Sequence, residues 1–111
     1  MPAYMFIKTR VTDREQYLKY VEAAQALAPK YGRKFLVLSQ PVEMLEGQAS
    51  TFGLQGSRDQ WSTDYVLVSE WPSAEVARTF WNSEEYAAVR KLRESAGEVH
   101  VLLAESLPPP R

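Results

Sequence analysis

One side chain in this sequence is a natural candidate for moving a proton near neutral pH, where the unperturbed pKa of histidine lies. It is His100, the single histidine of the chain. His100 lies in a stretch expected to be the last strand, on the same strand face as Leu102 and Ala104. A lone histidine in such a position also serves as a hydrogen-bonded structural residue. We therefore predict His100 as a candidate catalytic residue and keep the structural interpretation open.

A second chemical feature is a group of cations on the last helical stretch, Arg90, Lys91 and Arg93. Residues at the spacing of Arg90 and Arg93 occupy adjoining positions on one helix face. Their guanidinium groups could bind a carboxylate or phosphate by forked hydrogen bonds. The same cations also suit the negative end of a helix, or an ion pair with Glu85 or Glu94. Arg93 is kept as a candidate substrate-binding residue.

Three aromatic residues, Trp71, Trp81 and Tyr86, gather around an expected strand-to-helix junction. Aromatic side chains in such a place pack into the core, and they also form walls of ligand pockets. In the second case Arg93 would orient an anionic group of a small, partly aromatic or acidic metabolite. We expect the three aromatic residues and Arg93 to bind substrate, with core packing as the alternative for the aromatic residues.

Four stretches must form the sheet that positions these residues: 4–11, 35–39, 64–71 and 98–106. The first helix begins at a capping box, formed either by Thr12 with Glu15 or by Asp13 with Gln16. It ends before Pro29, because proline supplies no amide hydrogen and disfavours helical geometry in the preceding residue.

The second helical region follows Pro72, with Ser73 as its N-cap. Ser83 interrupts this region and can cap its continuation, which ends at Gly97. The order is therefore strand, helix, strand, strand, helix, strand. With right-handed crossovers it predicts an α+β, ferredoxin-like fold, in which an antiparallel four-stranded sheet carries both helical stretches on one face.

The predicted strands are apolar on both faces, as in Phe35-Leu36-Val37-Leu38. Successive side chains point to opposite sides of a sheet, and the helices cover only one side. If about six such side chains lay bare, at roughly 1.5–3 kcal/mol each, the cost would be comparable to the stability of a small domain. A second copy of the chain is the simplest cover, so the sequence predicts a homodimer packed through the other sheet face.

Composition sets broad limits. The chain of 111 residues suits one domain over residues 1–106 and a loose tail over 107–111. Thirteen basic and fourteen acidic residues leave it nearly neutral, which does not favour nucleic acid or membrane as a partner. There is no cysteine, no apolar stretch of membrane-spanning length and no signal-peptide pattern at the start. We expect a soluble, cytoplasmic protein.

Several short segments follow one another along the chain: Met1-Pro2-Ala3-Tyr4, Val11-Thr12-Asp13, Tyr31-Gly32-Arg33-Lys34-Phe35-Leu36-Val37, residues 41–47, Glu70-Trp71-Pro72-Ser73 and Phe80-Trp81-Asn82-Ser83-Glu84-Glu85-Tyr86, then Arg90 and Arg93. In this order and at nearly this spacing they resemble the domain-of-unknown-function family 1330, from Met1 to about Ser106. That family belongs to the dimeric α+β barrel superfamily. The resemblance implies two ferredoxin-like units packed sheet to sheet, and it brings no established substrate.

The resemblance also bears on single residues. The family usually has a glutamate where this chain has Glu70, which implies that Glu70 is a buried acid and a second candidate catalytic residue; an ion pair with Lys8 or an arginine is the alternative. The family usually reads arginine-glycine-glycine where this chain has Leu38-Ser39-Gln40, and a double glycine where it has Gly32-Arg33. An anion bound by the family's arginine would be lost here.

Cofactors and nucleic acid are not expected. The stretch from Trp71 to Tyr86 resembles part of the haem-degrading monooxygenases of the same superfamily, whose axial histidine is replaced here by Arg90. We therefore expect no haem, and there are too few metal-ligating residues for a zinc site. An RNA-recognition module shares the strand order, but its aromatic-glycine signature is absent and the pI is about 5.8.

Two functional classes remain. The first is a cofactor-independent enzyme, like the superfamily's monooxygenases and isomerases, in which His100 or Glu70 moves a proton. The second is a non-catalytic small-molecule-binding or structural dimer. Residues 48–63 are long for a connection in so small a domain, so we predict a mobile cover over the pocket. An extended hairpin that lengthens the sheet or embraces the partner is the alternative.

Overall fold

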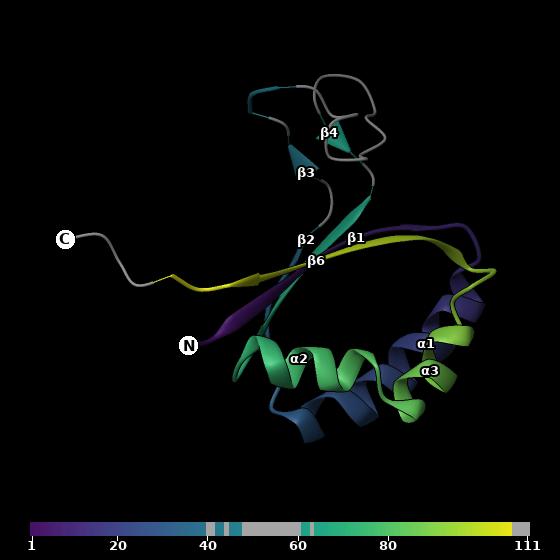
Figure 1. The fold of residues 1–111 in the computed structure, drawn as a ribbon. Coiled ribbons are helices and arrows are strands. Elements are labelled where there is room, and N and C mark those ends of the chain that lie inside the picture. Colours follow the sequence, from purple (N-terminus) through teal and green to yellow (C-terminus); the bar gives the residue numbers. More distant parts are fainter. Residues whose placement is uncertain (40–41, 44, 48–60, 63, 108–111) are drawn as a thin grey trace.

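The main sheet has the predicted four-stranded antiparallel arrangement in the computed structural model, which describes residues 1–39, 42–43, 45–47, 61–62 and 64–107. Its strands are β1 (Ala3–Val11), β2 (Lys34–Ser39), β5 (Tyr65–Trp71) and β6 (Gly97–Glu105). They lie in the order β2-β5-β1-β6, so that the first and third long strands are central (Figure 1). The prediction of a ferredoxin-like α+β fold is confirmed.

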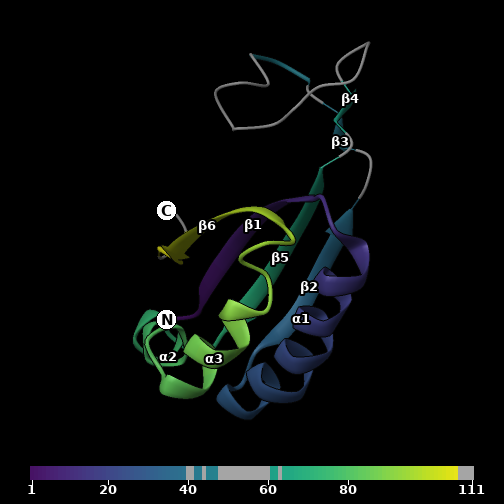
Figure 2. The same ribbon diagram turned by 90° about the vertical axis from the view of Figure 1, so that its right-hand side faces the viewer.

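Three helices of the described chain lie on one face of this sheet (Figure 2): α1 (Arg14–Leu27), α2 (Ala74–Trp81) and α3 (Glu84–Lys91). They begin at the capping residues that the sequence indicated. Asp13 accepts a hydrogen bond from the Gln16 amide, and Ser73 and Ser83 accept equivalent bonds at the starts of α2 and α3. Each cap satisfies an amide that has no partner within its helix.

The turn after α1 determines where β2 begins. Pro29 lies in a short 3-10 helix (Ala28–Tyr31), and Gly32 follows it with a φ of 86° in the left-handed region. A Cβ added to Gly32 would lie 2.7 Å from Cγ of Pro72. Glycine is therefore required both by the backbone conformation and by the close approach. The turn brings Arg33 back against Gln25 of α1.

The core between the helices and the sheet is built on aromatic contacts. The ring of Phe80 lies 4.8 Å from that of Trp71 and 4.4 Å from that of Tyr86, measured between centroids. All three residues are buried, and Trp71 Nε1 donates a hydrogen bond to Ser69 Oγ at 3.0 Å. Aromatic rings bury large apolar areas, so this cluster is a major contributor to the stability of the helix layer.

No described helix covers the opposite face of the sheet, which we call the open face (Figure 2). Phe6 of β1 and Leu102 of β6 are register partners that both point to it, because side chains alternate along a strand. Phe6 is 43% exposed and Leu102 is 70% exposed. The apolar character on both sides of the strands, which the sequence indicated, is therefore present in the folded chain.

A second, two-stranded antiparallel pair is formed by β3 (Val42–Glu43) and β4 (Trp61–Ser62), which extends past one end of the main sheet (Figure 1). Residues 48–60 and 63, on which the predicted mobile cover depends, lie outside the described residues, as do 108–111 of the predicted tail. The pairing of β4 with β3 agrees with the alternative of an extended hairpin, but only for residues 42–43 and 61–62.

Candidate functional site

A cavity of about 620 Å³ lies between α1 and the helix-covered face of the sheet. Much of its wall is apolar, and α1 and the sheet both contribute: Ile7, Leu67 and Val101 come from strands, and Leu18, Val21 and Ala24 come from α1. Pockets that hold small organic ligands have volumes of about 300–1,000 Å³ and mostly apolar walls. We refer to this space as the α1 cavity.

Tyrosines from α1 and α3 supply much of the polar lining. The hydroxyl oxygens of Tyr20 and Tyr86 lie 2.8 Å apart, in a hydrogen bond that either group can donate. The Tyr17 hydroxyl donates to Thr9 Oγ1 at 3.3 Å. The four residues all line the α1 cavity. The helix cap at Ser83, whose Oγ accepts from the Tyr86 amide, anchors the start of α3 and with it this ring.

Burial keeps two of these tyrosines protonated. It raises the pKa of Tyr20 far above its ordinary value, and the neighbouring Tyr86 hydroxyl raises it further. Burial also raises the pKa of Tyr17 and outweighs the hydrogen bond with Thr9, which acts in the other direction. A protonated phenol is a hydrogen-bond donor, and the proton of the Tyr20–Tyr86 pair that is not used within the pair suits a ligand atom that carries or develops negative charge.

Two arginines lie beside the hydrogen-bonded pair Tyr20–Tyr86. Arg33 lines the α1 cavity, and its Nη2 donates to Gln25 Oε1 at 2.9 Å. The guanidinium carbon of Arg93 lies 5.3 Å from the centre of the Tyr20 ring. The Nε atoms of both arginines are buried and have no hydrogen-bond partner among the described residues.

Both guanidinium groups keep their charge. Burial lowers the pKa of Arg33, and interactions with Tyr20 and Tyr86 act against that shift. Burial also lowers the pKa of Arg93, but interactions with the hydroxyls of the same two tyrosines outweigh it, so that the pKa of Arg93 is raised. Arginine is not deprotonated in proteins near neutral pH. The polar end of the α1 cavity is therefore positive.

The three predicted aromatic residues pack in one core cluster, as the core-packing alternative held, but they do not all face the same cavity. Tyr86 lines the α1 cavity, and Arg93 packs on Tyr20 beside it. Trp71 belongs to the buried core, whereas Trp81 lines a smaller cavity of about 220 Å³ between α2 and β6. In the described structure these four predicted residues do not bound one pocket, because Trp71 and Trp81 lie outside the α1 cavity.

His100 and Glu70 lie on the open face. His100 is the register partner of Lys8, and both it and Glu70 alternate with residues that point toward the helices. The sheet separates them from the α1 cavity. Neither residue therefore lines the α1 cavity with Tyr86, and catalysis by His100 or Glu70 stays a prediction.

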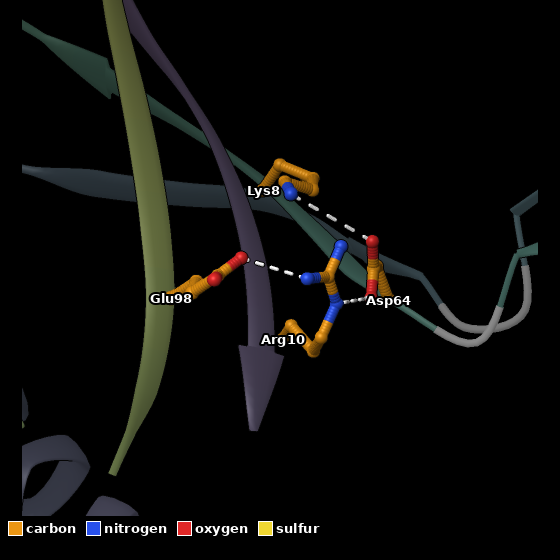
Figure 3. A network of polar contacts seen from close by, with 4 residues as sticks. All are labelled: Lys8, Arg10, Asp64 and Glu98. Carbon is orange, nitrogen blue, oxygen red and sulfur yellow. Dashed lines mark hydrogen bonds and ion pairs between the residues drawn. The ribbon is translucent and has the colours of Figure 1, made fainter. Parts of the chain in front are cut away.

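Beside His100, the open face carries an ion-pair network of four residues, Lys8, Arg10, Asp64 and Glu98 (Figure 3). Asp64 Oδ1 lies 3.3 Å from Arg10 Nε and Asp64 Oδ2 lies 3.8 Å from Lys8 Nζ, while Arg10 Nη1 donates to Glu98 Oε2 at 2.7 Å. Asp64 is only 1% exposed. Lys8, which the sequence offered as a partner for Glu70, thus has Asp64 within ion-pair distance.

Three residues of the α1 cavity had no functional role in the sequence analysis, namely Arg33, Tyr17 and Tyr20. The two tyrosines belong to the apolar stripe of α1, where a buried hydroxyl needs a polar partner inside the protein. That requirement was the feature of the sequence that could have indicated a polar site at Tyr17 and Tyr20. For Arg33 the corresponding feature was the replacement itself, since the family that the sequence resembles usually has glycine at this position.

Among the described residues, no group of three or more histidine, cysteine, aspartate or glutamate side chains could hold a metal ion. Arg90, which stands where haem-degrading relatives have their axial histidine, has its guanidinium carbon 5.1 Å from the centre of the Trp81 ring. This is cation–π geometry. No helix in the described ranges has the length and apolar character needed to cross a membrane.

The fold and the cavity together define a class, a ferredoxin-like α+β protein with a ligand-sized space between its first helix and its sheet. The chain belongs to the family described as Domain of unknown function (DUF1330), whose model matches residues 2–107. The resemblance stated from the sequence is thereby confirmed. Among curated proteins, none matches the chain.

Solved structures share this fold at low sequence identity. A protein of unknown function from Rhodopseudomonas palustris has a TM-score of 0.71 and 19% identity, over 97% of this chain and 84% of that one. SnoaB, a cofactor-independent oxygenase from Streptomyces nogalater, has a TM-score of 0.60 and 13% identity, over 97% and 95%. A dimeric protein of unknown function with a ferredoxin-like fold from Bacteroides fragilis has a TM-score of 0.53 and 16% identity, over 95% and 96%.

Proposed function

We propose that the chain binds a small organic metabolite in the α1 cavity and acts on it as a cofactor-independent enzyme. The observation that carries this proposal is the Tyr20–Tyr86 hydrogen-bonded pair at the polar part of an otherwise largely apolar space of about 620 Å³. Neutral phenols in a water-poor site stabilise negative charge that develops on a substrate oxygen. A reaction through an enolate or phenolate form of the substrate, such as isomerisation or cofactor-free oxygenation, needs this stabilisation.

The fold supports the proposal by analogy, because SnoaB has the same architecture and is a cofactor-independent oxygenase. A specific observation favours the second candidate, a non-catalytic binding protein. None of the described residues that line the α1 cavity is an aspartate, glutamate or histidine. An enzyme of this kind would depend on a substrate acidic enough to ionise beside the tyrosines, without a protein carboxylate or imidazole as base.

The test uses p-nitrophenol, whose phenolate form is coloured. If the site stabilises an oxyanion, bound p-nitrophenol ionises at a lower pH than free p-nitrophenol, by about one unit for roughly 1.4 kcal/mol of preferential stabilisation. Absorbance titrations of the wild type, Tyr20→Phe and Tyr86→Phe measure this shift, which should shrink in both variants.

Location is tested by filling the cavity. Val21→Trp on α1 should abolish binding and with it the shift in the ionisation of p-nitrophenol. Glu22→Trp, at the exposed neighbouring position, should leave that shift unchanged. Binding that survives Val21→Trp would place the ligand elsewhere. Binding without any shift in ionisation would favour the non-catalytic candidate.

We also propose that a second copy of the chain covers the open face. The exposed side chains of Phe6, Val37 and Leu102 support this, and the protein from Bacteroides fragilis with the same fold is dimeric. His100 and Glu70 would then lie at the interface. Light scattering at micromolar concentration should give twice the chain mass of 12.7 kDa, and Leu102→Arg should reduce it to one chain. A well-folded wild-type monomer would contradict the proposal.

A further inference from the structure

Arg33 is held at the cavity wall in a way that leaves part of its hydrogen-bonding capacity unused. Its Nη2 is held by Gln25 at 2.9 Å, and its guanidinium carbon lies 5.8 Å from the centre of the Phe35 ring. Its buried Nε finds no hydrogen-bond partner in the described structure. A guanidinium group has five N–H donors, and the described structure shows one of them bound by Gln25, so an acceptor atom of a ligand in the cavity would be stabilised by the others.

Arg93, which packs against Tyr20, presents the same feature. Its buried Nε also lacks a hydrogen-bond partner among described residues, and its guanidinium group packs on the Tyr20 ring. Within the described ranges, neither Arg33 nor Arg93 lies within ion-pair distance of a carboxylate. Among the described residues, two cations without a carboxylate partner therefore lie near the hydrogen-bonded tyrosine pair, although the chain as a whole has a net charge of −1.

We propose that this end of the α1 cavity is an anion subsite, in which Arg33 binds a carboxylate of the ligand next to the Tyr20–Tyr86 pair and Arg93 orients that pair. The inference rests on the proposed function and deepens it by naming the substrate class, an apolar ring compound that carries a carboxylate. A carboxylate matches the planar fork of a guanidinium group, while the apolar remainder of the cavity receives the ring.

The test compares three probes of similar shape by calorimetric titration: 1-naphthoate, its neutral amide 1-naphthamide, and 1-naphthyl phosphate. Wild-type protein should bind naphthoate about 10- to 100-fold more tightly than naphthamide, as expected for a charge-assisted hydrogen bond. Arg33→Met, which keeps much of the side-chain volume, should remove this preference and leave the affinity for naphthamide nearly unchanged. Arg33→Lys should retain only part of the preference for naphthoate, because lysine keeps the positive charge but lacks the planar guanidinium fork that matches a carboxylate.

Arg78→Met is the matched control, since Arg78 lines the smaller cavity at α2. It should leave all three affinities unchanged. Equal binding of naphthoate and naphthamide by the wild type would overturn the anion subsite while leaving the cavity proposal intact. Failure of every probe to bind would overturn both. Tighter binding of naphthyl phosphate than of naphthoate would show a phosphate site and overturn the assignment to carboxylates.

Discussion

The two faces of the four-stranded sheet hold their positive charges in different ways. On the open face, Lys8 and Arg10 both lie within ion-pair distance of Asp64, so the network contains its own countercharge. On the helix-covered face, Arg33 and Arg93 lie among tyrosines and an amide, with no described carboxylate at ion-pair distance. A balanced buried network is complete without a ligand, whereas unbalanced cations beside a cavity favour one.

The apolar residues differ between the faces as well. Under the helices they form a buried aromatic core, while on the open face they remain accessible to water in the single chain. The first arrangement stabilises the chain by itself. The second contributes fully only when something covers it, so stability that comes from the open face should depend on protein concentration.

The largest effect is expected for Phe80→Ala, which removes the central ring of the core. Loss of a buried phenylalanine side chain should lower the free energy of unfolding by about 3–5 kcal/mol, measured by urea denaturation. Phe6→Ala on the open face is the matched control. The loss of unfolding free energy in Phe6→Ala should be smaller in dilute protein, and it should rise with protein concentration as two chains associate through the open face. If both variants lose the same unfolding free energy at every protein concentration, the proposed difference between the two faces is contradicted.

Asp64→Asn is expected to have the next largest effect. It removes the charge that faces both Lys8 and Arg10 at a position that is 1% exposed. Breaking a buried ion pair from one side typically costs about 3 kcal/mol or more, because the cationic partner stays buried. Urea denaturation measures the loss. A change below about 0.5 kcal/mol would show that the network adds nothing to stability.

Alkaline pH should lower the stability of the folded chain, because Tyr20 is buried on the helix-covered face. Burial raises the pKa of Tyr20 above its value in the unfolded chain, so above about pH 10 the folded state keeps a proton that the unfolded state loses. Stability is then lost as pH rises, by about 1.4 kcal/mol per pH unit for each such group. Tyr20→Phe should flatten the decline between about pH 9 and pH 11 in urea denaturation. An unchanged slope would contradict the assignment.

The smallest effect is expected for Glu98→Gln, at the exposed end of the same network. Its side chain is 63% exposed, and surface ion pairs contribute about 0–1 kcal/mol. The loss of stability in urea should therefore be well below that of Asp64→Asn. A comparable loss in both variants would mean that burial does not distinguish the two carboxylates.

Much of the fold followed from local patterns. The strands observed as β1, β2, β5 and β6 agree with the predicted stretches to within about a residue, and the serine caps of α2 and α3 were identified correctly. These features depend on neighbours in the chain: alternation within a strand, a capping side chain three residues before the amide it satisfies, a proline after a helix. Such signals are complete within a short window of sequence.

The site was predicted less well. Trp71, Trp81 and Tyr86 were correctly grouped in one aromatic cluster, but only Tyr86 lines the α1 cavity. A residue's distance from a cavity depends on which face of the sheet it occupies and on which helix crosses above it. His100 was assigned to the right strand and to the strand face of Leu102 and Ala104, but the sequence did not show that this face lies opposite the α1 cavity.

By itself, the sequence determined the ferredoxin-like order of strands and helices and the presence of apolar groups on both sheet faces, because alternation, helical spacing and caps are local. Only the tertiary structure decided that Asp64 meets Arg10, 54 positions away, or that Arg33 reaches the cavity of Tyr20 and Tyr86. These contacts arise from strand register and from how α1 packs on the sheet, and both depend on the whole folded chain.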